Sequence, residues 1–172
     1  MTRPTAITVE DNYSRLLQWR VLASKAEAVP LEQFDCAEPW PKAPGGRRLP
    51  QHPRMWEHEA QRHVRNLRQI MRAGDRVLVG VDTSREADIT AAVLHLRFRE
   101  EPGSRLIAVM EVGAVAMSHR SPHPPYVGDE IMAVAEREAL AVVDERGCAG
   151  LALVGFIHTR NNASMRMASR ND

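Results

Sequence analysis

The sequence predicts a single α+β domain, residues 1–172, with a mixed sheet made of an antiparallel meander and one parallel crossover strand. A chain of 172 residues suits one compact domain. In the middle of the chain, short connectors with turn residues separate three segments rich in β-branched residues, as in hairpins. A long amphipathic segment then precedes one more apolar run, which is the order of a strand–helix–strand crossover.

The N-terminal part is predicted to be two helices joined by a long loop. Apolar residues recur at helical spacing over about residues 9–28, which indicates the first helix. Residues 29–54 contain many prolines and glycines, which exclude regular helix or central strand. Phe34 and Trp40 in this loop either anchor it to a core or line a binding cleft. A second amphipathic helix covers about residues 55–73.

The remaining elements follow in order along the chain. The three strands of the predicted meander are residues 76–82, 89–99 and 105–117. A long helix covers about residues 128–146. Residues 150–157 are nearly all apolar, as in a strand buried on both faces, and should lie parallel to the third strand. A short amphipathic helix from Asn162 to about Arg170 completes the prediction.

Composition excludes several classes of protein. Lys and Arg total 23 against 22 for Asp and Glu, so no overall charge attracts nucleic acid or anionic lipid. No apolar run approaches the roughly 18 residues of a membrane span. The N-terminus lacks a signal-peptide pattern. Cys36 and Cys148 are too few for a disulfide framework, and His58 and His63 lack metal-motif spacing. We expect a soluble cytoplasmic protein without a metal.

Three local patterns resemble the GNAT superfamily of N-acetyltransferases. Residues 110–115 (MEVGAV) resemble the fourth strand of that family, where an acidic residue often precedes a valine by four positions. Residues 127–147 resemble the long helix that follows it, and residues 156–164 (FIHTRNNAS) resemble the fifth strand and the start of the next helix. The resemblance implies an acyl-CoA N-acyltransferase fold, with acetyl-CoA lying where the fourth and fifth strands separate. It also implies acetyl transfer to a primary amine of a small molecule or a protein.

The resemblance places Glu111 at the acidic position of the family. It would accept a proton from the incoming ammonium, directly or through a water. Alternatively, Glu111 is a structural partner for an arginine such as Arg97 or Arg99, because a carboxylate in an apolar strand is costly unless paired. Gly113 either forms a bulge whose N–H group would polarise the thioester carbonyl, or only allows close packing.

The resemblance implies that acetyl-CoA contacts residues after the fourth strand and at two helix starts. These residues are Val115, Met117, Arg120, Gly128, Asn161 and Ser164. The pyrophosphate would lie at the N-terminus of the long helix. There, Asp129 and Glu130 depart from the glycine-rich loop of the family and are suited to capping the helix. Their negative charge would repel the pyrophosphate, and Arg120 would compensate for that charge. Asn161 and Ser164 would contact the pantetheine arm, and can also cap their helix.

Two further features keep other functions open. The family has two more strands after the last predicted helix, so these are absent or supplied elsewhere, for example by a second subunit of a homodimer. One face of the second helix carries four arginines, which are either solvated surface or a nucleic-acid contact: Arg62, Arg65, Arg68 and Arg72. The alternative functions are therefore a non-catalytic regulatory or interaction module, or a toxin that acetylates tRNA through this arginine face.

Overall fold

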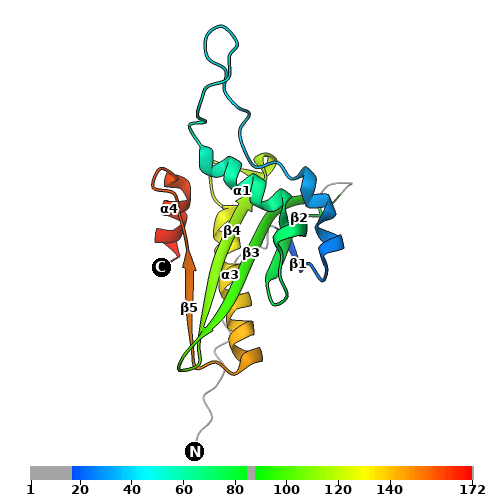
Figure 1. The fold of residues 1–172 in the computed structure, drawn as a ribbon, viewed down its shortest axis with the longest axis vertical. Coiled ribbons are helices and arrows are strands. Elements are labelled where there is room, and N and C mark those ends of the chain that lie inside the picture. Colours follow the sequence, from blue (N-terminus) through cyan, green and yellow to red (C-terminus); the bar gives the residue numbers. More distant parts are fainter. Residues whose placement is uncertain (1–16, 85–87, 172) are drawn as a thin grey trace, which may run out of the picture.

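The structure is a computed structural model that describes residues 17–84 and 88–171. It contains a five-stranded sheet in the order β1-β2-β3-β4-β5 (Figure 1). The strands are β1 Gln18–Val21, β2 Arg76–Asp82, β3 Ile89–Glu101, β4 Arg105–Val115 and β5 Gly150–Gly155. The first four pair antiparallel to their neighbours, and β5 pairs parallel to β4. The predicted mixed sheet with one parallel crossover strand is therefore confirmed.

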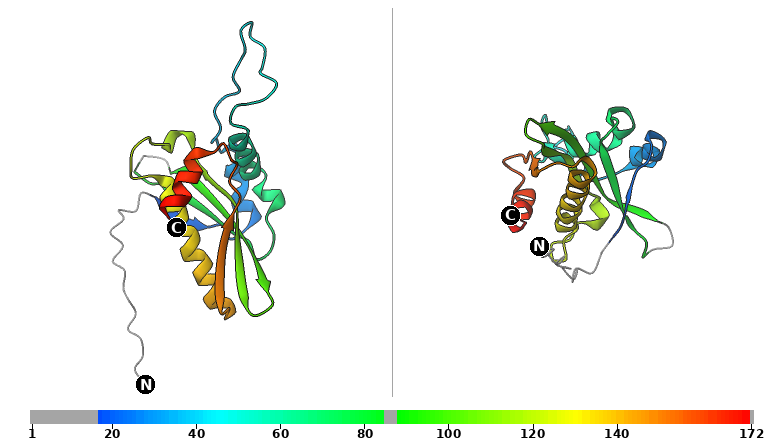
Figure 2. Two further views of the ribbon diagram at one scale, coloured as in Figure 1. Left: turned by 90° about the vertical axis from the view of Figure 1, so that its left-hand side faces the viewer. Right: turned by 90° about the horizontal axis from the view of Figure 1, so that it is seen from below.

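Helices cover both faces of this sheet, as the views in Figure 2 show. They are η1 Lys25–Gln33, α1 Met55–Arg65, α2 Leu67–Ile70, η2 Met117–His119, α3 Val127–Arg146 and α4 Asn162–Arg170, where η marks a 3-10 helix. One apolar cluster joins η1, α1 and α2 to the sheet, and a second joins α3 to the opposite face. The strand β3 contributes apolar residues to both clusters, and its polar residue His95 is fully buried among them.

The predicted first helix is wrong in its described part. Residues 18–21 form β1 and pair with β2, and residues 25–33 form η1, which also takes residues 29–33 from the predicted loop. Residues 9–16 lie outside the described residues. Leu17 and Val21 are four positions apart, and residues at this spacing share a face in a strand as well as in a helix. Local spacing therefore could not distinguish the two, and pairing with β2 decided it.

The predicted second helix is divided and shortened. It breaks at Asn66 between α1 and α2, and it ends at Ile70 instead of residue 73. Gly74 follows with a φ of 88°, a left-handed conformation that glycine adopts without strain. The N–H group of Arg72 donates to Asp75 Oδ2 across this turn at 3.0 Å. The turn thus delivers the Asp75 carboxylate to the sheet immediately before β2.

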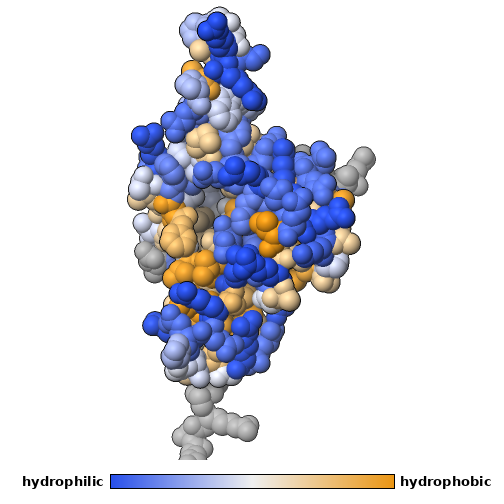
Figure 3. Space-filling view, in the orientation of Figure 1, coloured by the Kyte–Doolittle hydropathy of each residue, from blue (hydrophilic) through white to orange (hydrophobic). Residues whose placement is uncertain are grey.

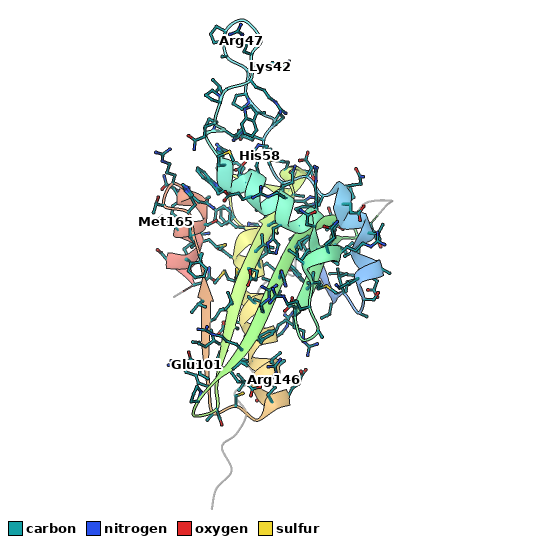
Figure 4. The ribbon with its side chains drawn as sticks, viewed as in Figure 1. Lys42, Arg47, His58, Glu101, Arg146 and Met165 are labelled. Carbon is teal, nitrogen blue, oxygen red and sulfur yellow. The ribbon has the colours of Figure 1, made fainter. Side chains whose placement is uncertain are left out.

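The segment between η1 and α1 projects from the body, with Lys42 and Arg47 at its outer end (Figure 4). At its base, the indole of Trp40 lies 5.2 Å from the ring of His58 on α1. Phe34 is 5% exposed and belongs to the core cluster under η1 and α1. Phe34 therefore anchors the segment to the core, as one of the two interpretations predicted.

No helix within residues 17–84 and 88–171 combines the length and apolar character that a membrane span requires.

Large apolar side chains are exposed around the end of β5, on the side where Figure 3 shows an apolar area. They are Val154, Phe156, Ile157 and Met165, of which Phe156 is 93% exposed. Among the described strands, β5 is an edge strand with one neighbour.

We expect this edge to associate with a second copy of the chain, because an unpaired strand with apolar neighbours favours association. Phe156→Ser should lower the average mass measured by light scattering during size-exclusion chromatography. Leu140→Ser, at an exposed position on α3, is the matched control. Equal masses for the native chain and the Phe156 variant at high concentration would contradict this expectation.

Candidate functional site

The strand β4 carries a bulge at Glu111. His95 lies opposite Val112 and Leu96 lies opposite Met110, so Glu111 has no partner position on β3. A bulge of this kind redirects a side chain and is often found beside a functional site. The option that Gly113 forms the bulge is wrong, because Gly113 pairs regularly with Leu94.

Gly113 instead allows close packing between β4 and α3. A Cβ atom at this position would lie 3.2 Å from a methyl carbon of Ile131. This contact is tighter than van der Waals packing normally allows. The second interpretation of Gly113, close approach of the backbone, is therefore the one that the structure supports.

A chain of hydrogen bonds runs from Asp75 through His95 to His63. Asp75 Oδ2 lies 2.9 Å from His95 Nε2, and His95 Nδ1 lies 2.9 Å from His63 Nε2. The side chain of His95 is fully buried, and that of Asp75 is 4% exposed. The three residues come from the turn before β2, from β3 and from α1, so only the folded sheet brings them together.

Arg97 joins this chain to Glu111. Its Nε donates to Asp75 Oδ1 at 3.3 Å, and its Nη1 donates to Glu111 Oε1 at 3.0 Å. The structure therefore contains the ion pair that the second interpretation of Glu111 predicted, and the arginine is Arg97. About a quarter of each of the Arg97 and Glu111 side chains remains exposed, so this ion pair can meet a bound molecule.

The ion pair and His63 line a pocket of about 480 Å³ between the sheet, η1 and the α2 segment. Most of its lining is polar, and cations outnumber carboxylates. The charged and polar residues are Lys25, His63, Gln69, Arg72, Arg97 and Glu111. The pocket therefore offers one carboxylate to a cationic group and several cations to an anionic one.

Burial and hydrogen bonding shift the pKa values of His95, His63 and Asp75. Burial lowers the pKa of His95 below its ordinary value and outweighs the opposing effect of Asp75. Burial also lowers the pKa of His63, with a further contribution from the neighbouring His95. Burial alone would raise the pKa of Asp75, but hydrogen bonds from Arg72 N–H, His95 and Arg97 lower it overall. At neutral pH the two imidazoles are therefore neutral and the carboxylate is ionised.

These pKa directions predict that stability falls as the pH is lowered from 7. The unfolded chain binds protons at His63 and His95 from about pH 6.5 downward, while the folded chain binds them only at lower pH. Asp75 adds a second loss below about pH 3.8, because its folded pKa is also depressed. Urea unfolding at pH 7.5, 6.0 and 5.0 should show decreasing free energies of unfolding.

The variant in which His63 and His95 are both replaced by Gln is the control for this pH dependence. It should lose much of the change in stability between pH 7.5 and 5.0, because its imidazoles are gone. A native chain that is equally stable at these pH values would contradict the prediction.

The strands β4 and β5 separate beside Glu111. Their pairing ends at Met110 and Gly155, while β4 continues to Val115. Val115 is half-buried in the cluster under α3. The N–H group of Met117, in η2, donates to the carbonyl of Asp35 at 3.0 Å. The backbone of β4 beyond Met110 therefore has no β5 partner among the described residues.

At the start of α3, the acidic residues have partners on other elements. Asp129 accepts a hydrogen bond from Arg170 of α4 at 2.7 Å, and Glu130 accepts from the indole of Trp19 at 2.8 Å. Neither caps the helix, whose N-cap residue is Tyr126, so the capping interpretation is wrong. Both carboxylates lie in the first turn, where the helix dipole favours negative charge.

Arg120 and Gly128 are held by close neighbours. Arg120 donates to the carboxylate of Glu57 on α1 at 2.8 Å, and also to the carbonyl of Cys36. A Cβ atom at Gly128 would lie 3.0 Å from the sulfur of Met167, so α4 packs directly on the first turn of α3. The structure thus brings Arg120 to α1, and its contact with a pyrophosphate stays a prediction.

The sequence and the fold were compared with those of known proteins. No family model and no curated protein matches the sequence. Solved structures with a similar fold include the following three. Ribosomal-protein-alanine N-acetyltransferase from Brucella melitensis biovar Abortus 2308 has a TM-score of 0.50 at 12% identity, over 90% of this chain and 89% of that one. AtaTR bound with AcCoA has a TM-score of 0.54 at 14% identity, and the match covers 90% of this chain and 82% of that one. Aminoglycoside acetyltransferase HMB0005, from an uncultured soil metagenomic sample, has a TM-score of 0.51 at 13% identity, and the match covers 91% of this chain and 90% of that one. The chain has a GNAT-like fold.

In this GNAT-like fold, Asn161 and Ser164 lie together at the start of α4. Asn161 is the N-cap residue, and its Oδ1 accepts from the Ser164 N–H group at 3.2 Å. Its Nδ2 also donates to Ser164 Oγ at 2.7 Å. The capping interpretation is confirmed, while contact of these residues with a pantetheine arm stays a prediction.

The four arginines of the second predicted helix have different surroundings. Arg65 donates to the carbonyl of the residue that follows η1 at 2.8 Å, and Arg68 lies 3.7 Å from a carboxylate of η1. Arg72 lines the pocket and Arg62 is exposed. Two of the arginines therefore contact η1 or the residue after it, one lines the pocket, and one faces solvent. Nucleic-acid contact through them stays a prediction.

Sequence reasoning missed Asp75 and His95 as site residues. The signal for His95 was present, because it stands in the apolar run AAVLHLRF, where an ionisable side chain needs a buried partner. The same argument singled out Glu111. Asp75 carried no such signal, because it follows a glycine in a polar turn.

Proposed function

We propose that this protein transfers the acetyl group of acetyl-CoA to the primary amine of a small molecule or a protein. One observation carries the proposal: Glu111 stands on a bulge where β4 leaves β5, and it lines a polar pocket. The separated strands offer a place for an acyl thioester, and the pocket offers a place for the amine. The GNAT-like fold supports the same reaction.

The residues at the separated strands and at the start of α3 fit a CoA group. The N–H groups of Val127 and Gly128 have no acceptor among the described residues, and the helix dipole favours a phosphate there. Arg170 offsets the charge of Asp129, which would otherwise repel the phosphate. Acetyl-CoA supplies the acetyl group when bound. The residues proposed to hold it are Val115, Met117, Arg120, Gly128, Asn161 and Ser164.

Glu111 is proposed to bind the incoming ammonium and to accept its proton, directly or through a water. Its Oε1 already accepts from Arg97, so this ion pair holds the carboxylate in one orientation. Oε2 is then the oxygen available to the ammonium. Loss of a proton gives the nitrogen the lone pair with which it attacks the thioester carbonyl.

Two measurements on the purified chain test this function. Calorimetric titration with acetyl-CoA should show binding, and thiol release from acetyl-CoA should rise when primary amines are added. Desulfo-CoA, which lacks the thiol, is a suitable binding control because it carries the same pyrophosphate. Absence of both heat at millimolar acetyl-CoA and amine-dependent thiol release would contradict the proposal and favour a non-catalytic module.

A further inference from the structure

The hydrogen-bonded chain from Asp75 to His63 ends in the same pocket as Glu111, but the proposed function gives it no role. A buried histidine pair beside an aspartate costs free energy of desolvation, so its contacts need to be well defined. Here each link is 2.9 Å long and the central ring is fully buried. The outer ring, that of His63, is only partly buried and lines the pocket.

The direction of every hydrogen bond in this chain follows from the Asp75 carboxylate. An ionised carboxylate can only accept, so His95 Nε2 carries a hydrogen and donates to it. A neutral His95 then has its lone pair on Nδ1, which must accept from His63 Nε2. A neutral His63 in turn has its lone pair on Nδ1. This nitrogen has no hydrogen-bond partner among the described residues.

The surroundings keep both rings neutral and the carboxylate charged. Asp75 also accepts from Arg72 N–H and from Arg97, which stabilise its ionised form. Burial lowers the pKa of His63, the neighbouring His95 and the charge of Arg97 lower it further, and the charge of Glu111 opposes them. The groups that face His63 are His95 and Arg97 from β3, Glu111 from β4, and Lys25 and Arg72 across the pocket. A neutral imidazole with an unused lone pair therefore stands beside the proposed ammonium site.

We propose that His63 Nδ1 is the final acceptor of the proton released by the ammonium, and that Asp75 and His95 hold His63 in the accepting tautomer. This inference rests on the proposed function and adds a second member to its proton path. Glu111 binds the ammonium and, directly or through a water, passes one proton to His63. Asp75 and His95 are positioning residues, because they act only through His63.

The atoms balance as follows. An ammonium R–NH3+ loses one proton to His63, which becomes an imidazolium and later releases that proton to solvent. The amine nitrogen forms a bond to the acetyl carbon as the carbon–sulfur bond breaks. The second proton of the nitrogen goes to the sulfur, so the products are the N-substituted acetamide and the free thiol of CoA.

Nuclear magnetic resonance of the native chain labelled with ¹⁵N-histidine tests the tautomers without any activity. Both His63 and His95 should show a protonated Nε2 and an unprotonated Nδ1 at pH 7.5. On acidification, His63 should gain its proton at Nδ1, with a pKa below 6.5. A protonated Nδ1 on neutral His63 would overturn the inference.

Kinetics of His63→Gln test the role in proton transfer, with turnover measured by thiol release and the most active amine of the panel. The variant should lower kcat by about 100-fold or more. It should also lose the acidic limb of the pH profile of kcat/KM, whose midpoint in the native chain should equal the pKa of His63 measured by resonance on the free enzyme. His123→Gln, at an exposed position in the loop before α3, is the control and should leave the profile unchanged.

Calorimetry with acetyl-CoA separates the two proposals. A native chain that neither binds acetyl-CoA nor releases thiol would overturn the proposed function. A His63→Gln variant that binds acetyl-CoA as the native chain does, but keeps both its kcat and the acidic limb, would overturn only the role of His63. Binding at native affinity together with the loss of kcat and of the limb supports both.

Discussion

Replacing Glu111 with Gln is expected to lower kcat by about 100- to 10,000-fold, the range in which a positioned proton acceptor contributes. Glutamine has the same size, and its carbonyl oxygen can still accept from Arg97, so the bulge and the pocket should persist. It carries no charge to attract an ammonium and accepts no proton. The affinity for acetyl-CoA should stay the same, because the proposed place of that group is between the strands and not in the pocket.

The measurement is a kinetic comparison of the native chain, Glu111→Gln and the control Glu101→Gln, with calorimetry for acetyl-CoA affinity. Glu101 lies at the far end of β3, away from the pocket (Figure 4). A loss in kcat with unchanged affinity indicates an interaction made in the transition state. If Glu111→Gln and Glu101→Gln were equally active, Glu111 would be only a structural partner of Arg97.

Replacing Asp75 with Ala is expected to lower the free energy of unfolding by about 3–5 kcal/mol, because removal of one buried charged partner leaves the others uncompensated. His95 Nε2 would lose its acceptor in a fully buried position. The guanidinium of Arg97 would lose two hydrogen bonds, and Arg72 N–H would lose one. The large effect comes from these unpaired groups rather than from lost packing.

Urea unfolding followed by circular dichroism measures this effect. Asp144→Ala, at an exposed position on α3, is the control and should change stability by only about 0.5 kcal/mol. Asp75→Asn should be less harmful than Asp75→Ala, because an amide oxygen can still accept from His95. Equal stability of the native protein and Asp75→Ala would show that the hydrogen bonds of Asp75 contribute nothing to the free energy of unfolding.

Much of the fold follows from local sequence patterns. The strand at Arg76–Asp82 and the helix at Asn162–Arg170 have the predicted bounds, and β3, β4 and α3 begin within one residue of prediction. These segments combine a clear hydrophobic period with turn or capping residues at their ends, so each one specifies its own conformation. Glu111 was also recognisable, because a charged residue stands out in an apolar strand.

Only the tertiary structure determined that residues 18–21 form β1, that β4 has a bulge, and that Asp75, His95 and His63 are hydrogen-bonded. The spacing of Leu17 and Val21 suits a helix and a strand equally, so pairing with β2 had to choose between them. The bulge depends on the register between β3 and β4, which no single segment specifies. Likewise, His63 and His95 are 32 positions apart, and they meet because α1 packs on the sheet. Local periodicity specifies the conformation of one segment, whereas a site of this kind requires long-range contacts between several.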